Sequence, residues 1–417
     1  MKAPTDSFIS DLIRERRPGF SLPAELYTSE AAFRADLDVF FHRHWIMAAF
    51  EADVPEPGDV RAIEVGETSI LILRDDDGSV RGFHNVCRHR GARLLPSGSH
   101  SVGRLICPYH QWSYDLTGEL KHAAHMGRAL NKSCFGLRPI GVRVIAGLVM
   151  VCIADDMPDD IDSMAAVLTP RLAPLDLARA KIAQETMIVE EGNWKLSIDN
   201  NRECYHCAGG HPELSLTFNQ YDTGCDPDEL APAERAEWES HCAVSDAETK
   251  RWEDAGHPSK LIEHMTGRAT MFRTQRLVIA GAGEAHTMDT QRACRKLLGS
   301  MRDGRMGDLH FWTHNSWHHY FADHAVVSYV VPVAPNQTLL RTVWLVNKDA
   351  VEGQDYDLER LTEVWRATNH QDAAFVAVAH KGISSAGYVP GPLSEHVERL
   401  VDLNLSWYIE RLQAHGY

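Results

Sequence analysis

Two cysteine and histidine pairs are the residues of this chain whose types and spacing are best suited to chemistry. The first pair is Cys87-Arg-His89 and the second is Cys107-Pro-Tyr-His110, with seventeen residues between His89 and Cys107. Two thiolates on one iron and two imidazoles on the other form a Rieske [2Fe–2S] cluster, whose histidine ligands raise its reduction potential. The spacing therefore predicts a centre that accepts and passes single electrons.

A zinc site is the alternative for these four residues, because two cysteines and two histidines are a common tetrahedral zinc set. The flanking sequence favours iron, since the first loop reads Cys-Arg-His-Arg-Gly and the second reads Cys-Pro-Tyr-His-Gln-Trp. Strand-like residues 80–85 and 104–106 precede the two loops, and residues 116–118 resemble a hairpin turn. Both ligand pairs are thus expected on loops between strands.

A second group of potential ligands lies in residues 193–211, directly after an apolar segment. His206 and His211 are five residues apart, which places them about 140° apart around a regular helix. They converge only if the helix is distorted or ends between them, and Gly209-Gly210 provides the conformational freedom for that. Together with one carboxylate, two histidines form the facial triad of non-haem Fe(II) oxygenases, which leaves positions open for O2.

The carboxylate of such a triad has two candidates. Glu203 lies one turn before the first histidine, whereas Asp372 lies in a predicted C-terminal helix, 161 residues beyond the second. We favour Asp372, although spacing does not decide between them. The histidines could also be ordinary polar residues, or form a zinc site with Cys204 and Cys207. Iron is favoured because an electron carrier in the same chain needs a destination for its electrons.

Composition narrows the class of protein. A formal net charge of −16 argues against nucleic-acid binding, which needs a basic surface. No apolar run reaches the length of a membrane span and the N-terminus lacks an apolar signal core, so a cytoplasmic location is the default expectation. Nine cysteines without regular spacing make a disulfide framework unexpected. Free thiols are expected at Cys134, Cys152, Cys225, Cys242 and Cys294.

The length of 417 residues predicts more than one domain. We place an N-terminal helical segment that packs with the catalytic domain at residues 1–41, a Rieske domain at 42–155 and a catalytic domain at 156–417. Helical periodicity occurs over residues 31–48, and alternation predicts strands at 181–189 and between 309 and 347. Two further helices are expected at about 356–380 and 394–413.

The chain resembles a known family, the α subunits of Rieske-type non-haem iron oxygenases, over nearly its whole length. The sharper likeness lies in Asn200-Asn-Arg-Glu-Cys-Tyr-His-Cys-Ala-Gly, in Trp344-Leu-Val-Asn-Lys-Asp-Ala-Val-Glu-Gly353 and in Tyr388-Val-Pro-Gly-Pro392. These segments are similar to the branch that demethylates quaternary amines, typified by glycine betaine monooxygenase and stachydrine (proline betaine) demethylase.

The resemblance implies an α+β fold with a β-rich Rieske domain and an antiparallel sheet around a long C-terminal helix, the helix-grip arrangement. It implies that the cluster ligands are Cys87, His89, Cys107 and His110, and that the iron ligands are His206, His211 and Asp372. Glu203 then hydrogen-bonds between a cluster histidine of one subunit and an iron-ligand histidine of its neighbour in a trimer, with Asn200 as a further catalytic residue.

The reaction is also implied by the resemblance. A separate flavin and iron–sulfur reductase draws electrons from NAD(P)H, and the cluster relays them to the iron. An N-methyl carbon of a quaternary amine such as glycine betaine is hydroxylated with O2, and the carbinolamine releases formaldehyde. Two alternatives share parts of this machinery: an oxygenase of aromatic rings, and an electron-transfer protein without oxygenase activity.

Recognition of a quaternary ammonium group depends on shape, charge and aromatic faces, because the group cannot donate a hydrogen bond. Residues 301–324 are rich in histidine and aromatic residues, and the run after Asp372 departs from that of near relatives. The alternative for such aromatics is core packing within a strand. The candidates for an aromatic substrate site are Tyr205, Trp312, Trp317, Tyr320 and Phe321.

Overall fold

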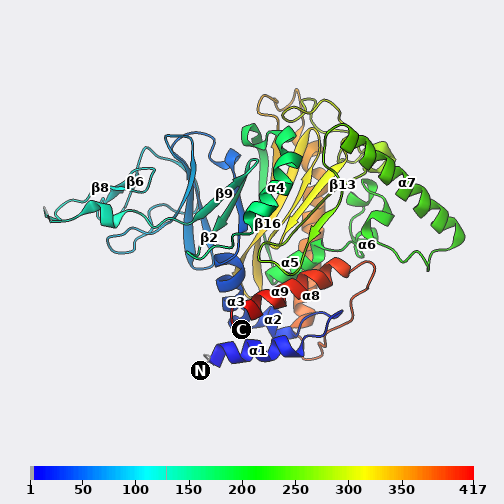
Figure 1. The fold of residues 1–417 in the computed structure, drawn as a ribbon, viewed down its shortest axis with the longest axis horizontal. Coiled ribbons are helices and arrows are strands. Elements are labelled where there is room, and N and C mark those ends of the chain that lie inside the picture. Colours follow the sequence, from blue (N-terminus) through cyan, green and yellow to red (C-terminus); the bar gives the residue numbers. More distant parts are fainter. Residues whose placement is uncertain (1–3, 128) are drawn as a thin grey trace.

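The computed structural model describes residues 4–127 and 129–417, so the first three residues of the predicted N-terminal segment lie outside it. Figure 1 shows a β-rich part on one side, residues 46–152, and a larger part built around a long twisted sheet. We call them the Rieske part and the catalytic part. Within the described ranges, no helix is both long and apolar enough to span a bilayer.

The Rieske part contains three antiparallel sheets. Their strand orders are β4-β3-β2-β5, β1-β10-β9 and β6-β7-β8. The strands are β1 Ile46–Phe50, β2 Asp59–Val65, β3 Thr68–Arg74, β4 Val80–His84, β5 Gly98–Ser101, β6 Leu105–Ile106, β7 Ser113–Tyr114, β8 Leu120–His122, β9 Gly141–Ile145 and β10 Leu148–Cys152. The β6-β7-β8 sheet lies at the tip of the molecule farthest from the catalytic part (Figure 1).

The catalytic part is built on a seven-stranded antiparallel sheet of order β11-β17-β16-β15-β14-β13-β12. Its strands are β11 Lys181–Glu190, β12 Ile262–His264, β13 Phe272–Leu277, β14 Asp308–Thr313, β15 Ser316–Tyr320, β16 His324–Ala334 and β17 Gln337–Val346. The helices are α1 Pro4–Glu15, α2 Ala24–Thr28, α3 Glu30–Asp36, α4 Ile161–Leu172, α5 Trp194–Asn201, α6 Cys207–Gly210, α7 Pro232–Asp254, α8 Leu358–Ile383 and α9 Arg399–Ala414.

The long helix α8 packs against this sheet. It contacts the edge strand β11, and Asn369 on α8 donates a hydrogen bond to Thr342 on β17 (Nδ2 to Oγ1, 2.9 Å). Apolar residues of both elements, including Trp344 and Trp365, share one buried cluster. A sheet wrapped around a long C-terminal helix is the predicted α+β architecture, and the structure confirms it.

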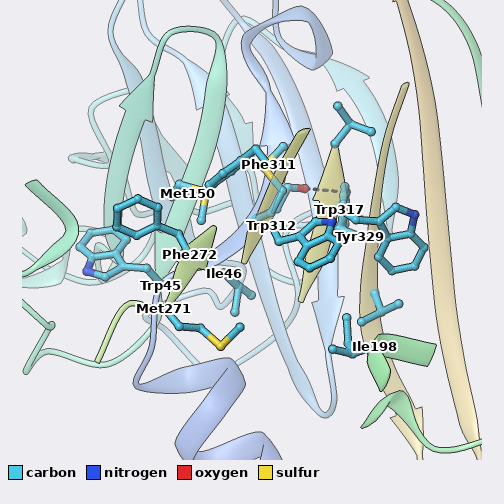
Figure 2. Packing of buried hydrophobic residues seen from close by; sticks show 14 of the residues in the cluster. Trp45, Ile46, Met150, Ile198, Met271, Phe272, Phe311, Trp312, Trp317 and Tyr329 are labelled. Atoms are coloured by element: carbon cyan, nitrogen blue, oxygen red, sulfur yellow. Dashed lines mark hydrogen bonds between the residues drawn. The ribbon is translucent and has the colours of Figure 1, made fainter. Parts of the chain in front are cut away.

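The two parts share a continuous core. Figure 2 shows Trp45, Ile46 and Met150 close to Phe272 and Phe311 of the catalytic sheet, and all belong to one buried cluster. Polar contacts join the same surfaces. Asn315 pairs with both backbone groups of Met47 at 3.0 and 3.1 Å, and Tyr329 donates to the carbonyl of Ala48 at 2.6 Å. Strand β1 is therefore fixed to the catalytic sheet.

One predicted helix has a different end from the one expected. The periodicity over residues 31–48 predicted a helix to residue 48, but α3 passes into a π-helical segment, Leu37–His42, and strand β1 starts at Ile46. The wider helical turn still buries Phe40 and Phe41 completely. A hydrophobic face read as helical continues into a strand here because every residue of β1 is buried, which leaves no alternation to detect.

A buried carboxyl group at the end of β11 predicts a pH effect on stability. Glu190 is 2% exposed and accepts a hydrogen bond from Ser197 on α5. Burial raises its pKa to about 7, so the folded protein prefers the protonated form. Its contribution to stability is complete below the unfolded pKa near 4.5 and is lost as the pH rises through 7.

We therefore expect Glu190→Gln to raise stability relative to the natural protein at pH 8, by up to about 3 kcal/mol, and to have little effect at pH 4. Thermal midpoints of both proteins at the two pH values measure this difference. Glu191→Gln, the same change at the exposed neighbouring residue, is the control. An equal effect of Glu190→Gln at both pH values would contradict the raised pKa.

Candidate metal centres and active site

The two loops with cysteine and histidine have the same backbone design. The amide of Cys87 donates to the carbonyl five residues later, at Ala92 (2.8 Å), and the amide of Cys107 donates to Trp112 (2.8 Å). In both loops the fourth residue after the cysteine has positive φ, with Gly91 at 75° and Gln111 at 60°. Each loop therefore closes on itself and presents its cysteine from a fixed turn.

The ligand groups of these loops fit a [2Fe–2S] cluster. Cys87 and Cys107 are both buried and unpaired, and the rings of His89 and His110 lie 4.6 Å apart. The Nδ1 atom of His89 is buried without a hydrogen-bond partner, and an iron would satisfy it. The hydroxyl of Tyr114 lies 3.3 Å from the Cys87 sulfur, a contact of the kind that tunes cluster potential.

A single zinc ion fits these four residues less well. Among the described residues, two groups of three or more metal-ligating side chains bring their ligand atoms within 4.8 Å of one another, and neither group includes the four. Tetrahedral zinc needs all its ligands at one point, whereas a two-iron cluster is held by two separate pairs. The arrangement favours the cluster over the zinc alternative.

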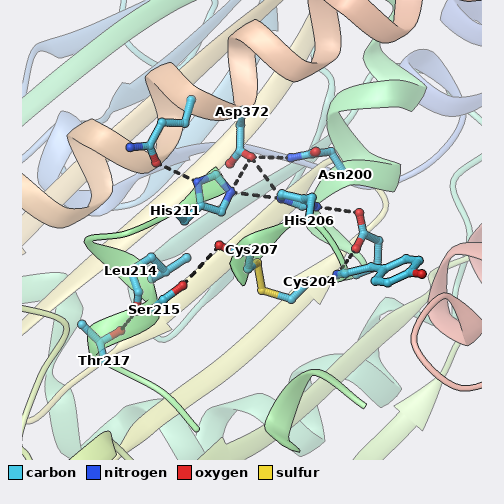
Figure 3. The surroundings of a disulfide bond; sticks show 12 residues. Asn200, Cys204, His206, Cys207, His211, Leu214, Ser215, Thr217 and Asp372 are labelled. Carbon is cyan, nitrogen blue, oxygen red and sulfur yellow. Dashed lines mark hydrogen bonds and ion pairs between the residues drawn. A yellow bond between two sulfur atoms is a disulfide. The ribbon is translucent and has the colours of Figure 1, made fainter. Parts of the chain in front are cut away.

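His206, His211 and Asp372 converge on one point. The Nε2 atoms of the two histidines lie 3.0 Å apart. Asp372 Oδ1 lies 2.9 Å from His211 Nε2 and 3.4 Å from His206 Nε2 (Figure 3). Asn200 donates to the same carboxylate oxygen at 2.6 Å. Two imidazoles and one carboxylate aimed at a common point are the donor set of a mononuclear iron, so the residues present fit that metal.

The local fold explains why histidines five residues apart can meet. Helix α5 ends at Asn201, and the two histidines flank α6, which is a single turn. The expected reason for Gly209-Gly210 was conformational freedom, but neither glycine has positive φ. A Cβ at Gly210 would lie 2.6 Å from the Phe375 ring of α8, so the glycine allows close approach of that helix instead.

Both histidines are oriented through their outer nitrogens. Glu203 Oε1 lies 2.7 Å from His206 Nδ1, so Glu203 is not at the point where the three ligands meet. Gln371 Oε1 lies 2.7 Å from His211 Nδ1, and Gln371 donates in turn to Glu213 at 2.8 Å. Hydrogen bonds of this kind fix the tautomer and orientation of metal-ligating histidines. No sequence pattern pointed to the pair Gln371 and Glu213, because their contact depends on the packing of α8.

The electrostatics of this point favour a positive charge. Burial acts to lower the pKa of His206, but hydrogen bonds to Asp372 and Glu203 raise it to about 9. Burial likewise acts to raise the pKa of Asp372, and its hydrogen bonds with both histidines bring it below its usual value. Anionic oxygen therefore surrounds the histidine nitrogens, which suits a bound cation.

Cys204 and Cys207 form a disulfide that spans His206 (Figure 3). This bond was not predicted from the sequence, where the two cysteines were instead possible zinc ligands. Their sulfurs are not available as thiolates in this state, which removes the zinc alternative for the segment. The five cysteines expected to be free are unpaired.

A cavity of about 300 Å³ opens onto the three converging ligands. Its wall includes Asp308, His310 and Trp312 of β14, which alternate along the strand and so share one face of the sheet. Arg273 of β13 and His319 of β15 stand beside them, and Trp365 of α8 closes the other side. A larger hollow of about 830 Å³ beside α7 contains none of the metal ligands.

Of the five aromatic residues predicted to bind substrate, one lines the cavity. Trp312 lines the cavity, and the guanidinium groups of Arg202 and Arg273 lie 4.6 and 5.2 Å from its ring centre. The other four do not line it. Tyr205 is 71% exposed, while Trp317, Tyr320 and Phe321 are buried in the core. Tyr320 pairs with Leu309, so it points to the opposite face from His319.

The fold and these centres together define an oxygenase that joins a Rieske cluster to a mononuclear iron. A family model for the Rieske [2Fe–2S] domain matches residues 44–139, and one for the ring hydroxylating alpha subunit (catalytic domain) matches residues 177–414. The chain belongs to the family of ring-hydroxylating oxygenase alpha subunits. This confirms the predicted enzyme class and its two cofactors.

Similar proteins extend the comparison. The chain is 38% identical over 411 residues to the glycine betaine monooxygenase oxygenase subunit of Pseudomonas aeruginosa (strain UCBPP-PA14), which covers 98% of this chain and 93% of that protein. It is 31% identical to the carnitine monooxygenase oxygenase subunit of Acinetobacter pittii (strain PHEA-2), over 46% of this chain and 53% of that one. The fold is shared with a solved quaternary ammonium Rieske monooxygenase, whose structure was reported with insights into carnitine oxidation and inter-subunit electron transfer. The TM-score is 0.71 at 20% sequence identity, and the match covers 99% of this chain and 100% of that one.

Proposed function

We propose that this oxygenase removes an N-methyl group from glycine betaine or a related betaine. The similarity to a glycine betaine monooxygenase subunit along 98% of the chain carries the proposal. The trimethylammonium substrate, O2, two electrons and two protons give the dimethylamine product, formaldehyde, water and one proton. Iron held by His206, His211 and Asp372 would supply O2 activation, and the protein contributes electron delivery and substrate placement.

The lining of the cavity supports a polar substrate. Asp308 is buried and ionised, since its contact with His319 lowers its pKa to about 2 although burial acts to raise it. Arg202 and Arg273 add positive charge to the same cavity. An aromatic hydrocarbon would leave these buried charges without new partners, at a cost in binding. This observation favours a zwitterionic amine over the alternative of aromatic-ring hydroxylation.

We infer that electrons reach the iron from the cluster of a neighbouring subunit in a homotrimer. Figure 1 has the β6–β8 sheet and helix α6 on opposite sides of the chain along its longest axis. Glu203 holds the outer nitrogen of His206, and its side chain remains 14% exposed. Such a carboxylate can receive a second hydrogen bond from outside the subunit. A separate reductase that takes electrons from NAD(P)H completes the system.

The test is a substrate screen with purified oxygenase and a reconstituted reductase. Formaldehyde release is measured for glycine betaine, proline betaine, carnitine and choline, beside hydroxylated products from simple aromatics. We expect formaldehyde and a demethylated amine in equal amounts from one betaine, with no aromatic product. His206→Ala, which removes an iron ligand and leaves the cluster loops intact, is the matched control. Hydroxylated aromatics without formaldehyde would overturn the proposal.

A further inference from the structure

A second cluster of buried polar side chains lines the substrate cavity. His286, Asp308 and His319 come from three separate segments and are 6%, 2% and 6% exposed. Each offers one ligand atom, and these atoms lie within 4.8 Å of one another. All three residues line the same cavity as the iron triad. The established and proposed chemistry at the iron does not use them.

One hydrogen bond within the cluster joins Asp308 to His319 and orients the imidazole ring. Asp308 Oδ2 lies 2.6 Å from His319 Nδ1, and because Asp308 is ionised, His319 donates that proton. The ring of His319 packs against two other rings, with its centre 4.6 Å from the ring centre of His310 and 4.1 Å from that of Trp365. Asp308 and these rings therefore hold His319 in one orientation, with Nε2 directed away from the Asp308 contact.

Three polar atoms of the cluster lack a partner. His319 Nε2, His286 Nδ1 and Asp308 Oδ1 are buried and make no hydrogen bond within the chain. Buried polar atoms without partners are costly and rare in folded proteins. The two imidazole nitrogens among them, at one place in a substrate cavity, indicate a ligand that accepts hydrogen bonds.

The charges near the cluster favour an anionic group on that ligand. The Asp308 charge is matched by its contact with His319 and by the nearby guanidinium of Arg276. Arg202 and Arg273 line the cavity as well, and Trp312 lies beneath both of them. The arginine guanidinium groups near these imidazoles attract a carboxylate more than a second ammonium group.

The distance from the iron suits a small betaine. Trp365 and Asp372 are seven residues apart on α8, which is two turns and roughly 10 Å along the helix axis. From standard bond lengths, glycine betaine spans roughly 5 Å from a methyl carbon to a carboxylate oxygen. With a contact of roughly 3 Å at each end, a molecule whose methyl group lies at the iron triad brings its carboxylate to the cluster at the Trp365 end.

We propose that His319, positioned by Asp308, and His286 anchor the carboxylate of the substrate, so that the cavity selects quaternary amines that carry a carboxylate. The anchor rests on the proposed N-demethylation, because it assigns the second pole of the same substrate. As an imidazolium, His319 donates its Nδ1–H to Asp308 and its Nε2–H to one substrate carboxylate oxygen, and His286 supplies a second contact. Choline, which has a hydroxyl group in place of the carboxylate, lacks the matching partner.

Binding to the iron-loaded oxygenase tests the anchor without turnover. The affinities of glycine betaine and choline are measured by calorimetry for the natural protein and for His319→Leu, Asp308→Asn and His286→Leu. We expect His319→Leu to weaken glycine betaine binding by about 10- to 100-fold, the loss of a hydrogen bond to a charged group. Choline binding should change little, so the preference for the carboxylate collapses. Asp308→Asn should have a smaller effect in the same direction.

His318→Gln is the matched control, since His318 precedes His319 on β15 and points to the opposite face of the sheet. Iron content and the Rieske spectrum verify the fold of each variant. An unchanged ratio of the two affinities in both histidine variants would overturn the anchor. So would metal analysis that finds an additional ion lost in His319→Leu, because the cluster would then be a metal site.

Failure of the anchor is distinguishable from failure of the proposed function. If the natural protein releases formaldehyde from a betaine while His319→Leu keeps its affinity ratio, only the anchor is wrong. If no amine yields formaldehyde, the proposed reaction is wrong. A loss of glycine betaine binding in Arg273→Lys alone, with both histidine variants unaffected, would move the carboxylate site to the guanidinium and also overturn the proposal.

Discussion

We expect that replacing Asp372 by alanine empties the mononuclear iron site and abolishes turnover, while the [2Fe–2S] cluster keeps its spectrum. The physical reason is that Asp372 supplies a carboxylate oxygen within 3.4 Å of both histidine Nε2 atoms. Without it, two neutral imidazoles face a divalent ion, and even loss of an outer hydrogen-bond partner typically costs about 10- to 100-fold in metal affinity. Removal of a ligand costs more.

Iron analysis and EPR measure this result. Iron per chain should fall from three to two, and the Rieske signal should remain. His370→Ala is a control on the same helix, two residues away and exposed. Full iron occupancy with normal turnover in Asp372→Ala would mean that another carboxylate completes the site. Glu203 would then be the first to examine, although it contacts the opposite nitrogen of His206.

Glu203→Gln should leave both metals bound and slow product formation by about 10²- to 10⁴-fold, the range for a positioned group that carries a proton. Glutamine retains the length of the side chain and can still accept a hydrogen bond from His206 Nδ1, so the iron ligand stays in place. It loses the negative charge that would receive a bond from a cluster histidine of a neighbouring subunit. Oxidation of the reduced cluster in a single turnover measures the transfer step directly.

Hydrogen peroxide separates electron transfer from damage at the iron. Hydrogen peroxide equals O2 with the two electrons from the cluster and two protons from water already added, so the trimethylammonium substrate and peroxide balance to the dimethylamine product, formaldehyde, water and one proton. We expect peroxide-driven formaldehyde release to be equal in Glu203→Gln and the natural protein. Equal loss with peroxide and with the reductase would contradict a bridging role for Glu203 and indicate a disturbed iron site.

Candidate metal ligands could be proposed from the sequence because each metal needs few residue types at short spacing. Cys87 with His89, and His206 with His211, are local pairs whose chemistry is evident without the fold. Asp372 was less certain, since its distance along the chain carries no geometric information. Only the packing of α8 against α5, and its close approach to Gly210 of α6, brings its oxygen to the histidines.

The substrate cavity was less predictable for a related reason. Alternation along β14 places Asp308, His310 and Trp312 on one face, but it does not say which face meets the cavity. The aromatics Tyr320 and Phe321 were therefore grouped with Trp312, although the cavity is lined by their neighbour His319. His286 lies between regular elements and Trp365 lies on α8, so neither shares a periodic pattern with the strands.

The polar clamp between β1 and the catalytic sheet has a mechanical consequence. Asn315 holds both backbone groups of Met47, and Arg341 forms a buried ion pair with Asp53 just beyond the same strand. A cluster carried by a hinged arm could swing toward its own iron, as mobile redox carriers do. Here the Rieske part and the catalytic part share one buried core, so separating them requires unfolding of both parts together. The electron would therefore cross a fixed gap, and in the proposed homotrimer the width of that gap is set by how copies of the chain assemble.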